Sequence, residues 1–139
     1  MTTSATIIRE LLNDSRRMTY PAELFGIRFP MCVKACAFDT ASSLSEDYDG
    51  GLWHFYTLSN GAFYMAPDCP SSVHLVCDNG FEGDLSADAF GITVCLYAYS
   101  LLSFSASGEF GEQCAQRYHW LRDYSFLHVE CGLIMAAIN

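Results

Sequence analysis

The sequence predicts an α+β fold, with a small three-stranded antiparallel β-meander packed by about four to five helices in a single domain. The length of 139 residues fits one domain of ordinary size. Hydrophobic residues make up 51% of the chain and charged residues 17%, which supplies a buried core and excludes an intrinsically disordered protein. Apolar residues recur at helical spacing near both ends, whereas the middle is aromatic, β-branched and rich in turn signals.

Two helices are predicted before the sheet. Residues 7–12 place their apolar side chains at helical spacing, and residues 13–15 follow as stop signals. A second helix is expected over residues 30–44, because Pro30 suits a first helical turn. Its apolar stripe consists of Val33, Ala37, Ala41 and Leu44.

The strongest local signal is a β-hairpin formed by residues 52–58 and 63–66. Asn60-Gly61 between them favours a two-residue type I′ turn, in which both residues have positive φ. In that register one face shows Leu58, Phe63, Tyr56 and Met65, and the other shows Trp53, Phe55 and Tyr64. A third strand is predicted over residues 73–77.

Three helices follow the sheet. After a turn at residues 81–86, Ser86 is a suitable N-cap and Asp88 complements the helix dipole in the first turn. The stripe of this helix is Phe90, Val94, Tyr97, Leu101 and Phe104, and Gly91 allows a close approach to the sheet. After a loop at residues 105–111, the last two helical faces are Cys114, Tyr118, Leu121 and Ser125, then Cys131, Ile134, Met135 and Ile138.

The charge distribution argues against a protein that binds nucleic acid. The net charge is −9, and residues 35–116 contain no Lys or Arg, whereas affinity for DNA depends on neutralising phosphates with these residues. Such a block should repel DNA and attract basic protein surfaces. The alternative, that the acidic side chains only keep an apolar protein in solution, stays open.

The seven cysteines indicate a reducing compartment. Their number is odd and residues 1–6 show no secretory signal, so we expect free thiols in the cytoplasm. A disulfide between Cys32 and Cys36 is disfavoured by their spacing on one helix. The longest apolar run, residues 92–102, is interrupted by polar side chains, so no membrane span is expected.

Catalytic and metal-binding motifs are not recognisable. No nucleophile elbow, cysteine-protease signature, P-loop or dinucleotide fingerprint occurs, so no catalytic residue and no cofactor are predicted, and His128 is expected to be structural. Cys69, His74 and Cys77 with His54 would supply four zinc ligands. Their spacing matches no established zinc pattern and free cysteines commonly fill cores, so no metal is predicted.

Three segments carry a resemblance to a known family. Residues 50–67, Gly-Gly-Leu-Trp-His-Phe-Tyr-Thr-Leu-Ser-Asn-Gly-Ala-Phe-Tyr-Met-Ala-Pro, resemble the signature of the plasmid-borne antirestriction proteins of the ArdB/KlcA type. Residues 79–92 are similar to the other hallmark of that family, and residues 117–124 fit its penultimate helix. The N-terminal twenty residues match poorly, so the chain is divided into a flexible segment, 1–20, and an antirestriction domain, 21–139.

The resemblance implies a small cytoplasmic bacterial protein, usually encoded on a mobile element, that relieves restriction by Type I restriction-modification systems. It implies an inhibitor and not an enzyme. The expected partner is the restriction complex or an associated host protein, without direct contact to nucleic acid, and a monomer is favoured. Two alternatives remain: an acidic DNA mimic that occupies the DNA channel of the complex, and a thiol or zinc enzyme that modifies its target.

The candidate partner-binding residues are Trp53, Tyr56, Glu82 and Asp84. Aromatic residues are enriched at the centres of interfaces, and acids beside them steer a basic partner. The structural alternative is that Trp53 belongs to the core and that Asp84 only helps to cap the following helix.

Overall fold

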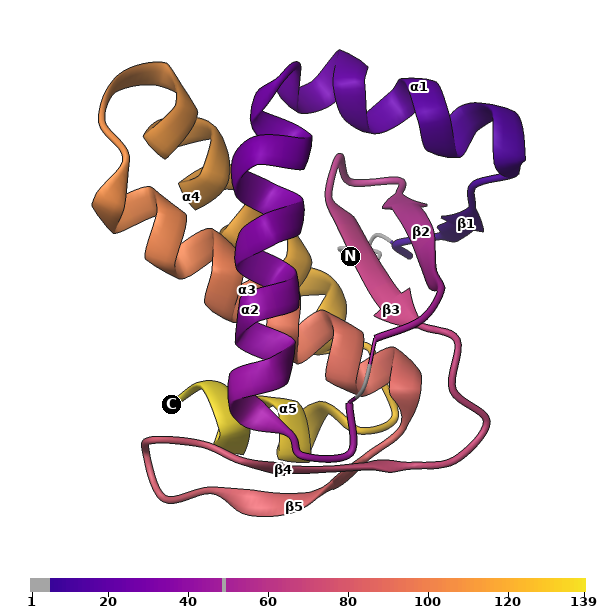
Figure 1. Cartoon of the computed structure of the whole chain (residues 1–139), viewed down its shortest axis with the longest axis vertical. Coiled ribbons are helices and arrows are strands. Elements are labelled where there is room, and N and C mark those ends of the chain that lie inside the picture. The colour runs from indigo at the N-terminus through magenta and orange to yellow at the C-terminus, as the bar shows by residue number, and fades with distance from the viewer. Residues whose placement is uncertain (1–5, 49) are drawn as a thin grey trace, which may run out of the picture.

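The computed structural model describes residues 6–48 and 50–139 as five α-helices, a π-helical turn and five strands (Figure 1). This confirms the predicted single-domain α+β class. The elements are β1 (Arg9–Leu11), α1 (Asp14–Phe25), η1 (Phe29–Val33), α2 (Lys34–Leu44), β2 (Trp53–Leu58), β3 (Phe63–Pro67), β4 (Val73–Val76), β5 (Glu82–Leu85), α3 (Ala87–Ser105), α4 (Gly108–Ser125) and α5 (Cys131–Ile138).

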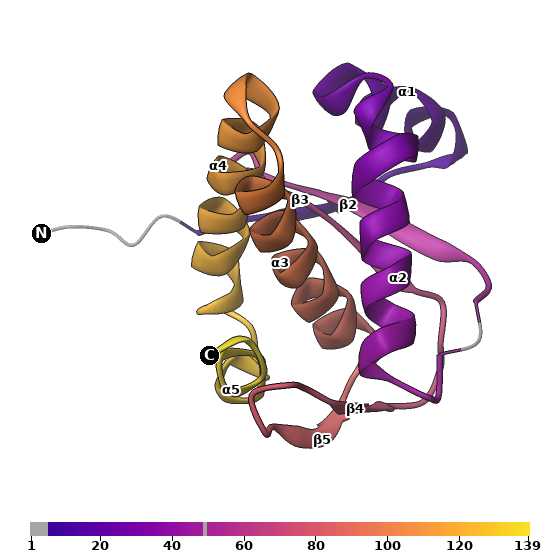
Figure 2. The same cartoon turned by 60° about the vertical axis from the view of Figure 1, so that its left-hand side comes forward.

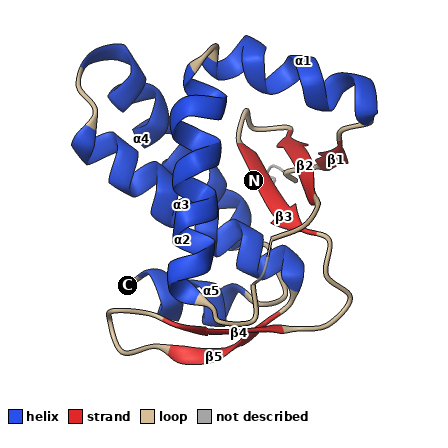
Figure 3. Cartoon of the chain, in the orientation of Figure 1, coloured by secondary structure: helices blue, strands red, loops and turns tan. Residues whose placement is uncertain are grey.

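The strands form two separate antiparallel sheets, of order β1-β2-β3 and β4-β5 (Figure 3). The prediction of three strands in the main sheet is confirmed, but its third strand is β1 and not residues 73–77. Residues 9–11 pair with residues 56–58, so the predicted helix over residues 7–12 is wrong. Residues 81–86, predicted as a turn, contain β5, which pairs with β4.

The segment expected to end the first helix instead begins one. The Asn13 side chain accepts a hydrogen bond from the Arg16 N–H at 2.8 Å, which is an N-cap interaction for α1. Asn, Asp and Ser satisfy the free N–H groups of a helix start as readily as they interrupt a helix. The same residues therefore mark the end of β1 and the start of α1.

The β2–β3 hairpin differs from its predicted register by one residue. Tyr56 pairs with Tyr64 and Thr57 with Phe63, so Tyr56 shares a face with Tyr64 rather than with Met65. The Leu58 N–H donates to the Ala62 carbonyl at 3.0 Å, which leaves a loop of three residues, 59–61. Gly61 has φ 97° but no non-glycine residue described has positive φ, so Asn60 does not form the type I′ turn. A three-residue loop with glycine at the left-handed position joins the strands instead.

Helix α3 is the centre of the molecule. In Figure 2 it lies between α2 and α4, with β3 behind it, and it packs on all three elements. Tyr99 donates a hydrogen bond to the Phe63 carbonyl at 2.7 Å, and the Cys95 thiol lies 3.4 Å from the Met65 backbone nitrogen. Side chains of α3 thus cover the outer edge of β3, which would otherwise present unpaired backbone groups.

Gly91 makes this approach possible, as predicted. A Cβ atom at this position would lie 2.3 Å from the Met65 carbonyl oxygen and 2.5 Å from Cα of Ala66. The predicted N-cap of α3 is also confirmed, because the Ser86 hydroxyl accepts the Ala89 N–H at 3.1 Å. The helix is long and apolar enough to cross a membrane by length and composition, although most of it is buried in the core, as in any central helix.

The remaining helices enclose this centre. The predicted stripe of α2, Val33, Ala37, Ala41 and Leu44, is buried. Phe29 of η1 packs edge-on against Phe55 and Phe63, with ring centroids 5.6 and 5.9 Å away. The predicted faces of α4 and α5 are confirmed at Cys114, Leu121 and Ile134, which are fully buried. Helix α4 starts at Gly108, inside the predicted loop.

Candidate functional site

Two of the four candidate residues lie at the first sheet and differ in their exposure. Trp53 is 2% exposed, and its indole N–H donates a hydrogen bond to the Tyr48 hydroxyl at 3.2 Å. Its ring packs 5.2 Å from that of Phe38. The structure therefore favours the core alternative for Trp53, whose indole has almost no surface to offer a partner.

Tyr56 is half-buried on the opposite face of the sheet. Its ring stacks on Tyr64 at 4.9 Å, and the Arg9 guanidinium lies 4.5 Å above it. Burial raises the pKa of Tyr56, so its phenol stays neutral near pH 7. Tyr56 can thus offer a neutral aromatic surface next to a cation, as expected of a residue at an interface.

Beneath Tyr56 lies a polar network centred on Asp88, in the first turn of α3. One carboxylate oxygen accepts hydrogen bonds from Arg9 at 2.8 Å and from the Tyr64 hydroxyl at 2.7 Å. The other lies 2.9 Å from Nε2 of His128. We call these four residues, Arg9, Tyr64, Asp88 and His128, the Asp88 network.

The electrostatics of the Asp88 network favour a fixed carboxylate. Burial alone would raise the pKa of Asp88, but hydrogen bonds from His128 and Tyr64 and the charge of Arg9 hold it below its usual value. Burial, together with the negative charge of Asp88, raises the pKa of Tyr64. The hydrogen bonds of these groups are made to one another, as expected of a structural network. They join Asp88 of α3 to Arg9 and Tyr64 of the sheet and to His128 of the α4–α5 connection.

The other two candidates, Glu82 and Asp84, lie on the exposed face of β5. His74 of β4 stands between them, with Nδ1 2.6 Å from Asp84 and Nε2 2.9 Å from Glu82. The backbone N–H of His74 donates to the Asp47 carboxylate at 2.9 Å. Hydrogen bonds to Asp84 and Glu82 raise the pKa of His74. The β4–β5 ribbon therefore presents two carboxylates that flank one imidazole, and a third carboxylate, Asp47 from the segment after α2, binds the backbone of the same residue.

A cavity of about 520 Å³ links the ribbon to the Asp88 network. It is lined by three carboxylate residues, Asp84, Asp88 and Glu130. Glu130 accepts the Ser86 N–H at 2.9 Å and also bonds the Ser86 hydroxyl. Ser86 and Glu130 therefore make the hydrogen bonds at the start of α3. Asp84 bonds His74 instead, so its contacts do not support the capping role.

The zinc alternative has little support from the arrangement of its four residues. In the described part of the chain no group of three or more His, Cys, Asp or Glu side chains is placed to hold a metal ion. Cys69 contacts Ser71, His54 lies 3.5 Å from Asp68, and His74 is held by the ribbon carboxylates. The seven cysteines are free thiols.

Sequence reasoning missed Arg9 and His74 as members of these clusters. Arg9 was assigned to a helix, and only its pairing in β1 brings it to Tyr56 and Asp88. The alternation in β4 already directs His74 away from buried Val73 and Leu75. Reading residues 82–85 as a strand would have placed Glu82 and Asp84 on the same face as His74.

The fold and its clusters define a class of small α+β proteins with two antiparallel sheets around a central helix. The chain belongs to the antirestriction protein family, whose model matches residues 46–139. This confirms the resemblance stated from the sequence. The division into residues 1–20 and 21–139 stays a prediction.

Individual relatives match almost the whole chain. Two antirestriction proteins KlcA of Escherichia coli are 42% and 36% identical to it, over 137 and 135 residues. Each alignment covers 96% of this chain, and 94% and 95% of the respective relatives. A solved structure aligns with a TM-score of 0.90 and 35% identity over 100% of this chain and 99% of its own. It comes from work on KlcA and ArdB, described as having a novel fold and antirestriction activity against Type I DNA restriction systems in vivo but not in vitro.

Proposed function

We propose that this chain is a cytoplasmic inhibitor that relieves restriction by Type I restriction-modification systems through contact with a protein, without an enzymatic step or cofactor. The partner is the restriction complex or an associated host protein. The observation that carries the proposal is the full-length similarity to the KlcA and ArdB structure, for which activity against Type I systems in vivo is stated.

The placement of the carboxylates supports protein contact over DNA mimicry. A mimic needs free acids spaced like phosphates along an extended surface. Here Asp88 is bonded to Arg9 and His128, and Glu82 and Asp84 flank His74. Mimicry remains the second candidate, because residues 35–116 contain no Lys or Arg.

The first test is the plating efficiency of unmodified phage on a host with a Type I system. It is done in cells, because the activity of KlcA and ArdB is described in vivo but not in vitro. Expression of the chain should raise the plating efficiency of unmodified phage and leave that of modified phage unchanged. Equal plating of unmodified phage with and without the protein would overturn the proposal.

The second test examines the acidic ribbon. Glu82→Gln with Asp84→Asn keeps the side-chain size while it removes two charges. The matched control, Glu109→Gln with Glu112→Gln, removes two charges from exposed positions of α4, which starts at the opposite end of the molecule (Figure 1). We expect weaker relief from the ribbon variant only, with its melting temperature within a few degrees of wild type. Full relief by the folded ribbon variant would refute its role, and loss of folding would make these residues structural.

Two further measurements separate the alternatives. A DNA mimic, which replaces many phosphates, should lose affinity for the restriction complex steeply as salt rises, whereas a protein interface with only a few ion pairs should lose less. An enzyme that modifies its target should leave a covalent change on it. The proposed inhibitor leaves none, so the intact masses of restriction subunits should be equal in relieved and in restricting cells. A mass change would favour the enzyme alternative.

A further inference from the structure

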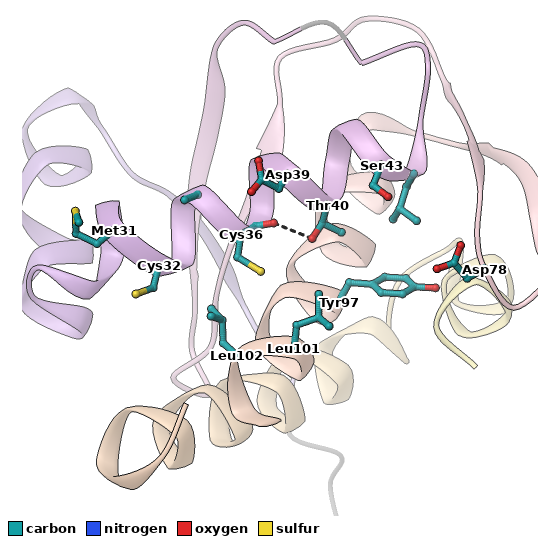
Figure 4. A pocket seen from close by; sticks show the side chains of 12 residues that line it. Met31, Cys32, Cys36, Asp39, Thr40, Ser43, Asp78, Tyr97, Leu101 and Leu102 are labelled. Carbon is teal, nitrogen blue, oxygen red and sulfur yellow. Dashed lines mark hydrogen bonds between the residues drawn. The ribbon is translucent and has the colours of Figure 1, made fainter. Parts of the chain in front are cut away.

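A groove between α2 and α3 has no role in the clusters described above. Figure 4 shows it lined from one side by residues of α2 and from the other by the C-terminal half of α3. Its volume is about 670 Å³. Apolar side chains form most of its wall, and Met31, Leu101 and Leu102 are prominent among them.

The apolar stripe of α3 continues out of the core into this region. Phe90 and Val94 are fully buried, as their spacing predicts. Further along the same stripe, Leu101, which lines the groove, is 54% exposed, and Phe104, one turn beyond the lining, is 88% exposed. Clustered exposed apolar side chains mark interaction surfaces, because burying them against a partner removes an unfavourable contact with water.

The charge of the groove restricts the partner. Asp39 stands on its α2 rim and Asp78 at the end near the Tyr97 hydroxyl (Figure 4), and both are exposed. No Lys, Arg or His is among the residues that line it. A complementary partner therefore carries Lys or Arg beside an apolar stripe.

The geometry also favours a helix over an extended peptide. Both walls are helices, whose backbone groups are hydrogen-bonded internally, so the groove offers no strand edge for β-augmentation. Helix α2, with 11 residues, is about 16 Å long, enough to contact about three turns of a partner helix. We propose that the α2–α3 groove binds an amphipathic helix of another protein, with apolar residues at i, i+4 and i+7 flanked by Lys or Arg. The inference rests on the proposed function, in that this helix belongs to the protein through which restriction is relieved.

A synthetic helix tests the groove directly. The probe is a fluorescent peptide of about 16 residues with Leu at helical spacing and Lys on the flanks, and a second peptide carries Glu in place of Lys. Fluorescence anisotropy at physiological salt should show that the full chain binds the Lys peptide and not the Glu peptide. Leu101→Ser should weaken binding at least tenfold. Asp39→Lys with Asp78→Lys should reverse the preference toward the Glu peptide.

Matched controls separate the groove from general charge and hydrophobicity. Leu133→Ser removes an apolar side chain that is 42% exposed on α5, and Glu109→Lys with Glu112→Lys reverses two charges on α4. Neither control should change peptide binding by more than about twofold. No binding by wild type, or equal losses in controls and groove variants, would overturn the groove proposal.

The restriction assay distinguishes the groove from the function on which it rests. If wild type gives no relief, the proposed function fails, while the peptide measurement still decides about the groove. If wild type relieves restriction and folded Leu101→Ser and Asp39→Lys/Asp78→Lys variants do so equally, the groove proposal fails alone. Sedimentation should show a monomer. A dimer that Leu101→Ser dissociates would make a second copy the occupant and overturn the proposal.

Discussion

Replacing Gly91 by alanine should destabilise the fold, although alanine is the better helix former. In an open helix this change gains about 1 kcal/mol. In α3 the new Cβ would lie 2.3 Å from the Met65 carbonyl oxygen and 2.5 Å from Cα of Ala66. Backbone atoms cannot rotate away as a side chain can, so α3 must move from β3 by about 1 Å to restore normal contact.

That movement affects the contacts that close the edge of β3. Tyr99 would be drawn from the Phe63 carbonyl, which it bonds at 2.7 Å, at a cost of about 1 kcal/mol. Overpacking costs a further 1–3 kcal/mol or more, and the propensity gain offsets about 1 kcal/mol. The free energy of unfolding should fall by about 2 kcal/mol, and the melting temperature by about 6–10 °C.

Gly132→Ala in α5 is the matched control. Nothing lies within 4 Å of its Cβ position, so this variant should gain up to about 1 kcal/mol from helix propensity. Far-ultraviolet circular dichroism with heat and with urea measures both changes. A Gly91→Ala protein as stable as wild type would refute the close packing of α3 on β3.

Three other predictions follow from local geometry. Gly61→Val, at φ 97° and with its Cβ position 2.8 Å from the Trp120 ring, should lower the free energy of unfolding by about 1–3 kcal/mol and weaken restriction relief. The control Gly80→Val, at φ 93° but with nothing within 4 Å of its Cβ position, should lower the free energy of unfolding less. An unchanged melting temperature for Gly61→Val would contradict the turn. Because the folded-state pKa of Asp88 lies below its unfolded value, its contribution to stability is present above about pH 4 and is lost as pH falls through the folded-state value. The free energy of unfolding of Asp88→Asn, measured with urea, should thus change less at acidic pH than that of wild type. An equal pH dependence of the two proteins would count against the network. Burial raises the pKa of the Cys95 thiol to about 12, so it should be among the last cysteines labelled by a thiol reagent, while chelator should leave the melting temperature unchanged.

The sequence was most informative where the helical pattern and its cap lie within one segment. Ser86 and the apolar spacing after it predicted α3, and Val33 to Leu44 predicted the buried side of α2. At the N-terminus, the spacing of residues 7–12 also fits a helix, but Leu12 is buried while Ile8 and Leu11 are exposed. The strand there depends on pairing with β2, which is remote in sequence and leaves no local signal.

The hairpin register could not be read from the turn dipeptide alone. Asn60 donates to the Trp120 carbonyl at 2.8 Å and accepts the Ala62 N–H at 3.1 Å, so contacts of its side chain to α4 and within the loop accompany the three-residue turn. Of the candidate site, Glu82 and Asp84 share a surface as expected, and Trp53 lies in the core. Periodicity in a short aromatic strand does not say which face meets solvent when helices cover both.

The Asp88 network has a consequence for how the protein is made. Its members, Arg9, Tyr64, Asp88 and His128, come from nearly the whole length of the chain. A chain still being translated, at about 5–20 residues per second, contains β1, β3 and α3 before His128 is added. Nascent chains that have not reached His128 therefore carry an unfinished sheet-to-helix junction, exposed to proteases and chaperones. Ribosome stalling between the codons of Asp88 and His128 should reduce the yield of this protein more than stalling before the codon of Tyr64.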